Sequence, residues 1–110
     1  MILVDTSVWI DYFNGVDSLE TDTLDKALGN ETVAIGDLIL IEILQGFRAD
    51  KQYYMAKQLL EPLNKFEMLG LNIAVKTADN YRKLRKKGIT IRKTADVIIA
   101  TYCIENDGWL

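Results

Sequence analysis

The sequence predicts an α/β fold in which helices cover both faces of a parallel sheet. The chain opens on Ile2-Leu3-Val4, a continuous apolar run, and such a run is typical of a strand covered on both faces, the central strand of a parallel sheet. A second short β-prone run, residues 32–35, again precedes a helical pattern, and alternating strands and helices indicate this fold class. The 110 residues suffice for one such domain, at the small end of the range.

Two helices are predicted between these strands. Thr6 or Ser7 is placed to cap a short helix that ends near residues 14–15, an Asn-Gly pair typical of a helix end. Residues 17–28 have few apolar side chains among acids and threonines, which suits a surface helix with one thin buried stripe. The chain is therefore expected to form two helices between its first and second strands.

The helix expected over residues 37–46 contains an isolated acid. Nearly every residue in it is aliphatic except Glu42. A helix that is apolar on all sides leaves little surface for solvent, and an ionised carboxylate in an apolar interior costs several kcal/mol without a cation or hydrogen-bond donors. We therefore expect Glu42 near the interior or in a cleft, although an exposed position on an otherwise apolar helix is the alternative.

The second half of the chain predicts three more helices and one more strand. Residues 50–63 are amphipathic, and Pro62 weakens the helix near its end. A short strand is expected over 66–69, a helix from Ala74 to Lys87, and a helix within 92–105 whose apolar side chains follow helical spacing.

The residues that are absent exclude several kinds of chemistry. The chain has no His and one Cys, which removes His-based acid–base catalysis, Ser-His-Asp triads, most zinc sites and any internal disulfide. Cys103 lies in an apolar helical pattern and is expected in the core. The sequence shows no apolar run long enough to span a bilayer and no signal peptide, so the expected location is the cytoplasm.

Carboxylates and clustered cations remain as the candidates for function. Asp5 follows the first strand, and ligands of open α/β sheets bind beyond the carboxyl ends of the strands. Asp96 falls in the first turn of the last predicted helix, where an acid interacts favourably with the helix dipole even without any function. The net charge of −3 argues against binding nucleic acid by bulk charge, but residues 82–87 and 92–93 are locally basic. The first of these clusters lies at the carboxyl end of a predicted helix, where the helix dipole favours cations, so part of it needs no ligand as an explanation.

Three segments together resemble the PIN domain, in particular the VapC-type toxins of bacterial toxin–antitoxin pairs. The segments are Val4-Asp5-Thr6-Ser7-Val8-Trp9-Ile10-Asp11, Ile41-Glu42-Ile43-Leu44-Gln45-Gly46 and Arg92-Lys93-Thr94-Ala95-Asp96-Val97-Ile98-Ile99-Ala100. The resemblance covers essentially the whole chain. It implies a three-layer α/β/α sandwich with a central parallel sheet, in which acids from separate elements converge at one end of the sheet.

The resemblance also implies the site. Asp5, Glu42 and Asp96 are expected as catalytic and metal-binding acids, with Thr6 or Ser7 as a supporting hydroxyl. Gathered carboxylates repel one another unless a cation is present, and Mg²⁺ or Mn²⁺, which prefers oxygen ligands, is the expected cofactor.

The implied activity is that of a metal-dependent endoribonuclease acting on RNA. Four cations are expected to hold the phosphate backbone: Arg92, Lys93, Arg85 and Lys86. The expected partners are a cognate antitoxin protein and a second copy of the chain in a homodimer, with no membrane involved.

The end of the chain departs from the family pattern. That pattern continues into a further strand and a loop that supplies a fourth acid, whereas this sequence stops at Leu110. We therefore expect a single domain over residues 1–110 that lacks this strand and loop, with Trp109 at the start of the missing strand. Asp107 lies in an Asn-Asp-Gly turn and is not expected to replace the fourth acid.

Two other enzyme and signalling classes fit the sequence less well. A haloacid-dehalogenase-like phosphatase requires a second Asp two residues after the first, where this chain has Ser7. A response-receiver domain requires an acidic pair after the first strand and a Lys after a late one, and neither pattern occurs. A catalytically impaired PIN-like module that binds a protein partner remains open.

Overall fold

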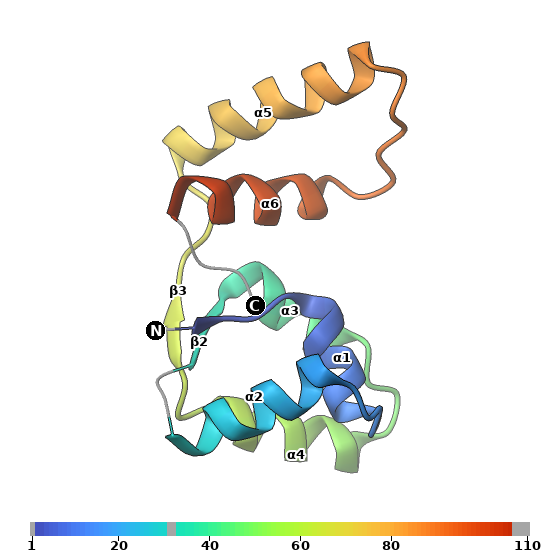
Figure 1. Ribbon diagram of the computed structural model, residues 1–110, viewed down its shortest axis with the longest axis vertical. Coiled ribbons are helices and arrows are strands. Elements are labelled where there is room, and N and C mark those ends of the chain that lie inside the picture. Colours follow the sequence, from blue (N-terminus) through green and yellow to red (C-terminus); the bar gives the residue numbers. More distant parts are fainter. Residues whose placement is uncertain (1, 31–32, 107–110) are drawn as a thin grey trace. The chain divides into compact units, whose positions relative to one another are not determined.

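The computed structural model describes residues 2–30 and 33–106, which divide into two compact units (Figure 1). Unit 1 extends to Phe66 and unit 2 starts at Glu67. The strands lie in unit 1, and two helices account for most of unit 2. The expectations for Asp107 and Trp109 lie outside the described residues.

Unit 1 is organised around a parallel sheet of β1 (Ile2–Leu3), β2 (Val33–Gly36) and β3 (Asn64–Phe66), in that order. Ile2 pairs with Val33 in β2, and Gly36 of β2 pairs with Phe66. The predicted α/β class with a parallel sheet is therefore confirmed. The prediction that the opening run is the central strand was wrong for the described strands, because β2 pairs on both sides and is buried at every position.

The third strand forms earlier than the sequence suggested. It was expected over 66–69 but occupies Asn64–Phe66. The cause is the length of its partner: β2 ends at Gly36, which already pairs with Phe66, and α3 begins at the next residue. A strand that continued past Phe66 would therefore find no further β2 backbone to pair with.

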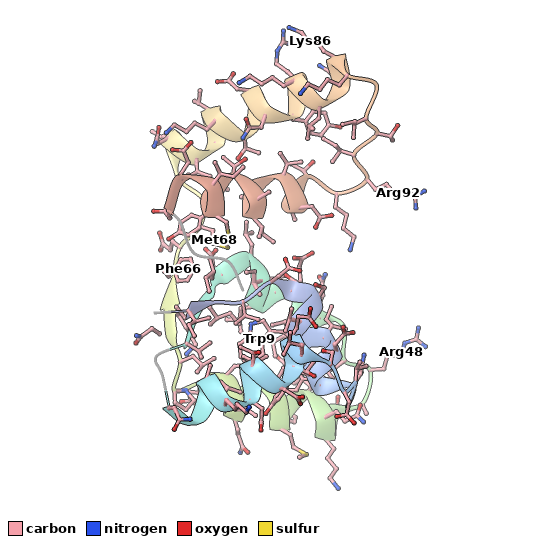
Figure 2. All side chains as sticks on the ribbon, in the orientation of Figure 1. Trp9, Arg48, Phe66, Met68, Lys86 and Arg92 are labelled. Atoms are coloured by element: carbon pink, nitrogen blue, oxygen red, sulfur yellow. The ribbon has the colours of Figure 1, made fainter. Side chains whose placement is uncertain are left out.

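Four helices surround the sheet of unit 1 in the described residues: α1 (Thr6–Phe13), α2 (Leu19–Asn30), α3 (Asp37–Gln45) and α4 (Asp50–Leu60). Helix α1 packs against both α2 and α3, and its Trp9 is fully buried (Figure 2). Helix α4 ends at Leu60, three residues before the end expected at residue 63. Pro62 has no backbone N–H with which to continue the helical hydrogen bonds.

A polar contact joins α1 to α2. The Tyr12 hydroxyl donates a hydrogen bond to Asp25 Oδ1 at 2.9 Å. Burial, and then this bond to the carboxylate, raise the pKa of Tyr12 above its ordinary value of 10.0. The neutral phenol is therefore the form that the folded protein favours.

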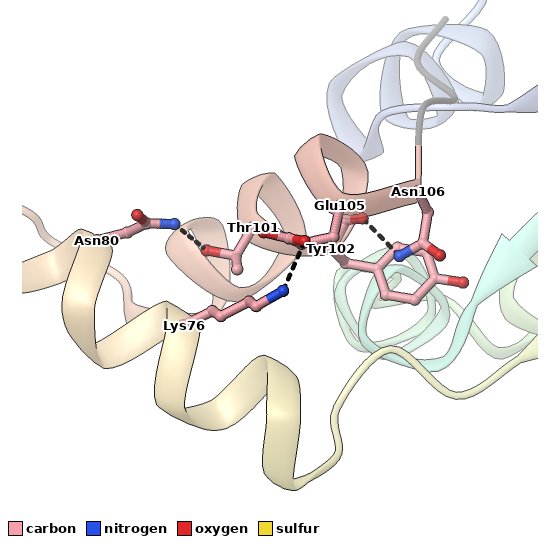
Figure 3. A network of polar contacts seen from close by, with 6 residues as sticks. All are labelled: Lys76, Asn80, Thr101, Tyr102, Glu105 and Asn106. Carbon is pink, nitrogen blue, oxygen red and sulfur yellow. Dashed lines mark hydrogen bonds and ion pairs between the residues drawn. The ribbon is translucent and has the colours of Figure 1, made fainter.

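Unit 2 is a pair of antiparallel helices, α5 (Leu71–Lys86) and α6 (Thr94–Asn106), lying side by side (Figure 1). Asn80 donates a hydrogen bond to the hydroxyl of the buried Thr101 at 3.0 Å, and Lys76 forms an ion pair with Glu105 at 2.7 Å (Figure 3). Cys103 is buried, as its apolar pattern predicted. No helix in the described ranges has both the length and the apolar character that crossing a membrane requires.

Candidate active site

Asp5 caps the helix that follows the first strand. Its carboxylate oxygen Oδ2 accepts a hydrogen bond from the backbone N–H of Ser7 at 3.2 Å and a second one from the Ser7 hydroxyl. The sequence had assigned the cap to Thr6 or Ser7, and this was wrong: Asp5 has the extended backbone of an N-cap, and helix α1 begins at Thr6. Asp5 therefore holds the helix terminus and presents a carboxylate there.

Thr6 connects this helix to the acid of the aliphatic helix. Its hydroxyl Oγ1 donates a hydrogen bond to Glu42 Oε1 at 3.0 Å, across 36 residues of sequence. The residue next to Asp5 thus holds the carboxylate of Glu42. The two hydroxyls that the sequence suggested as supporting groups donate hydrogen bonds to different acids. Ser7 donates to Asp5, and Thr6 donates to Glu42.

The order of the strands explains why these residues meet. Strands β1 and β2 are parallel neighbours, so their carboxyl ends lie at the same edge of the sheet. Helix α1 follows β1 and helix α3 follows β2, and the two helices pack against each other. Side chains early in α1 and in the middle of α3 are therefore brought together at the edge where α/β proteins bind ligands.

Glu42 lies at the border between the apolar interior and solvent. It is half-buried and lines a cavity of about 530 Å³ whose other walls include Ile10, Phe13, Phe47 and Arg48. Glu42 was expected near the interior or in a cleft, and the structure places it, half-buried, in the wall of a cavity. Among the residues that the structure describes, neither Glu42 nor Asp5 is in an ion pair with Lys or Arg, and the cation Arg48 only lines the same cavity as Glu42.

Asp96 belongs to unit 2. It lies in the first turn of α6, as predicted, and is exposed. It lines a second cavity, of about 650 Å³, together with three cations, Lys83, Lys87 and Arg92. The cavity is formed by the last turns of α5, the loop after it and one face of α6.

Only one of the four cations chosen from the sequence lines this cavity, namely Arg92. Arg85 lies over the ring of Tyr81, 5.8 Å from its centroid, and Lys86 points away from α6 (Figure 2). The sequence analysis included Lys83 and Lys87 in the basic run over residues 82–87 but did not single them out within it. Their spacing of four residues was the available signal, because such a pair shares one helix face.

The donor atoms fit a hard divalent cation. Within either unit taken by itself, the described residues contain no group of three or more His, Cys, Asp or Glu able to hold a metal ion. Unit 1 does bring Asp5 and Glu42 together through Thr6, and one oxygen of each carboxylate takes part in none of the bonds above. Carboxylates alone, without thiolate or imidazole, suit Mg²⁺ or Mn²⁺ rather than zinc.

Comparison with known proteins identifies the class. The PIN domain family matches residues 2–109, and the chain belongs to that family, as its motifs suggested.

Two relatives are 32% identical over 111 aligned residues, which cover 96% of this chain and 81% of each relative. They are named VapC ribonuclease Mb1587, from Mycobacterium bovis, and Ribonuclease VapC11, from Mycobacterium tuberculosis. A solved structure with the same fold is that of VapBC2 from Rickettsia felis bound to a DNA fragment from their promoter. It matches with a TM-score of 0.76 at 20% identity, over 98% of this chain and 84% of that one.

Proposed function

We propose that this protein is a metal-dependent endoribonuclease that hydrolyses RNA phosphodiesters as the toxin of a toxin–antitoxin pair. The observation that carries the proposal is the Thr6–Glu42 hydrogen bond beside Asp5. It brings together two carboxylates that form no ion pair among the described residues, at the edge of the sheet where α/β proteins bind ligands. The ribonuclease names of relatives at 32% identity support the same reaction.

The residues of the chain have distinct roles in this proposal. Asp5, Glu42 and Asp96 provide the carboxylate oxygens of a Mg²⁺ or Mn²⁺ site. Thr6 orients Glu42 and Ser7 orients Asp5, so that each acid is held before any cation arrives. Because the three acids are contributed by the beginning, middle and end of the chain, the site forms only in the folded protein.

The bound cation would supply a water of lowered pKa and would offset negative charge on the phosphodiester. The protein's own contribution is to position the cleaved linkage. Arg92 and Lys93 precede α6, the helix that carries Asp96, and are proposed to hold the RNA backbone beside it. Arg85 and Lys86 are proposed to add attraction for the polyanion at longer range.

The proposal is tested by isosteric removal of each acid. Asp5→Asn, Glu42→Gln and Asp96→Asn are each expected to lower Mn²⁺-dependent cleavage of single-stranded RNA by at least about 100-fold, with effects far from additive because the acids act as a unit. Asp11→Asn is the matched control, since Asp11 is an exposed acid on the same helix as Thr6 and outside the proposed site. Parental cleavage rates in all three variants would contradict the proposal.

A protein-binding role is the second candidate, and the cavity beside Glu42 favours it. The apolar side chains of Ile10, Met55 and Leu59 line that cavity and are exposed, as expected where a partner covers them. We propose that the cognate antitoxin is this partner. Met55→Glu should then weaken binding of the antitoxin, measured by titration calorimetry, whether or not the chain cuts RNA.

Titration with Mn²⁺ separates the two candidate functions. A cation that binds the folded chain raises its melting temperature by mass action, whereas a binding module without a metal site shows no shift at millimolar Mn²⁺. The homodimer stays a prediction, and light scattering of the purified chain measures it directly.

A further inference from the structure

We propose that the cavity between α5 and α6 is a nucleotide subsite, in which Lys83, Lys87 and Arg92 hold a phosphate of single-stranded RNA and the apolar wall receives the attached base. This inference rests on the proposed ribonuclease function and assigns the part of unit 2 that the substrate contacts. It assigns the main phosphate contacts to these three cations instead of to the whole basic run over residues 82–87.

The charged side of the cavity is the first argument. Lys83 lies in the last turn of α5 and Lys87, four positions later, is the C-cap residue of that helix, so both lie on one side of the helix end. Arg92 lies in the loop before α6 and lines the same cavity. All three are exposed and none is in an ion pair with an acid among the described residues. Three cations against the one acid Asp96 leave the lining of the cavity net positive, and a positive cavity attracts a phosphate rather than an apolar or cationic ligand.

The apolar side of the cavity is the second argument. Leu84, Ile91 and Ile104 line it, and Ile104 is 69% exposed. A volume of about 650 Å³ lies within the range of small-ligand sites. A nucleotide combines an anionic phosphate with a flat, weakly hydrated base, and that combination matches a wall that is cationic on one side and aliphatic on the other.

The position of Asp96 is the third argument. This acid lines the same cavity as the three cations and is also one of the proposed metal ligands. A nucleotide held here therefore lies beside the phosphodiester to be cut. Arg85 and Lys86 belong to the same helix but line no part of the cavity, so the subsite predicts that they contribute less than Lys83 and Lys87.

A pair of double variants tests the phosphate contacts. Lys83→Gln/Lys87→Gln and Arg85→Gln/Lys86→Gln remove the same charge from the same helix. Binding of a short fluorescein-labelled single-stranded RNA in EDTA should weaken on the order of tenfold in the first pair, with a salt slope smaller by about 0.7 for each phosphate that is no longer neutralised. The second pair removes only the longer-range attraction of Arg85 and Lys86 and should weaken binding clearly less than the first pair. Equal weakening in the two pairs would overturn the subsite.

A pair of apolar variants tests the base contact. Ile104→Ser changes an exposed side chain of the cavity, and Val75→Ser changes one that is 63% exposed on α5 and outside it. Only Ile104→Ser should weaken binding of the RNA, and neither should affect an abasic oligomer of the same length. If both oligomers bind Ile104→Ser as they bind the parent, the wall contacts no base and is free for a protein partner.

Kinetics distinguish a failure of the subsite from a failure of the proposed function. With Mn²⁺ present, Lys83→Gln/Lys87→Gln should raise KM for RNA and leave kcat unchanged, because the two lysines bind the phosphate equally in the ground and transition states. If Asp96→Asn abolishes cleavage while the lysine variant has the parental KM, the subsite is wrong and the nuclease stands. If the parent cuts no RNA but shows the predicted binding differences, the nuclease is wrong and the subsite stands.

Discussion

The hydrogen bond from Thr6 to Glu42 gives the sharpest test of the site. Thr6→Val removes the hydroxyl and keeps the branched shape. A hydrogen bond to a charged acceptor contributes about 1.5–3 kcal/mol to stability, and this one is only partly buried. We therefore expect the free energy of unfolding to fall by about 1 kcal/mol in urea titrations without metal.

The effect on the proposed metal site should be larger than the effect on folding. Loss of an outer-shell partner typically lowers metal affinity about 10–100-fold, and we expect about tenfold weaker apparent Mn²⁺ binding, measured by the rise in melting temperature. Thr6→Ser keeps the hydroxyl and is expected to bind Mn²⁺ within about threefold of the parent, well short of that loss. Either of two results refutes the reasoning: parental Mn²⁺ binding in Thr6→Val, or an equal loss in Thr6→Ser.

Further predictions concern stability. Gly29→Ala lies within α2 with open space around the new Cβ and should stabilise by about 0.5 kcal/mol in urea unfolding, whereas Gly15→Ala, at a φ of +74°, should destabilise by about 1 kcal/mol. Thr101→Val removes a buried hydroxyl and should lower unfolding free energy by about 1 kcal/mol, seen as faster hydrogen exchange in α5 and α6. Lys76→Ala breaks an exposed ion pair and should cost at most about 0.5 kcal/mol. Because burial and the bond to Asp25 raise the pKa of Tyr12, the protonated phenol contributes stability that is complete below about pH 10 and is lost as the pH rises through the raised pKa. The fall in unfolding free energy above about pH 10 should therefore be smaller in Tyr12→Phe than in the parent.

The helices and the fold class were predictable because their signals are local. Apolar periodicity located the aliphatic helix around Glu42 and the helix carrying Asp96 to within two residues. The third strand was misplaced because its extent depends on where β2 ends, at Gly36, and no local pattern near Phe66 contains that information. Strand pairing is a long-range property, and it also decides which strand is central.

The N-cap of α1 and the cavity between α5 and α6 show a second limit on what the sequence alone could predict. Asp, Ser and Thr are all good caps, so the sequence could not choose among Asp5, Thr6 and Ser7. The choice is made by Glu42, which engages the Thr6 hydroxyl from a helix 36 residues away. In the same way, the composition of the basic run could not separate Lys83 from Arg85, because only the packing of α5 on α6 decides which face becomes a cavity wall.

The distribution of charge along the chain fits the two tasks that the proposed reaction requires. Eleven of the sixteen acidic residues lie in residues 1–66, whereas eight of the thirteen Lys and Arg residues lie in residues 67–107. The excess of acids in unit 1 favours a divalent cation near Asp5 and Glu42, which form no ion pair among the described residues. The excess of cations in unit 2 favours a polyanion. The net charge of −3 does not reveal this division. The salt dependence of RNA binding should respond to the removal of Lys or Arg residues in unit 2, and much less to their removal in unit 1.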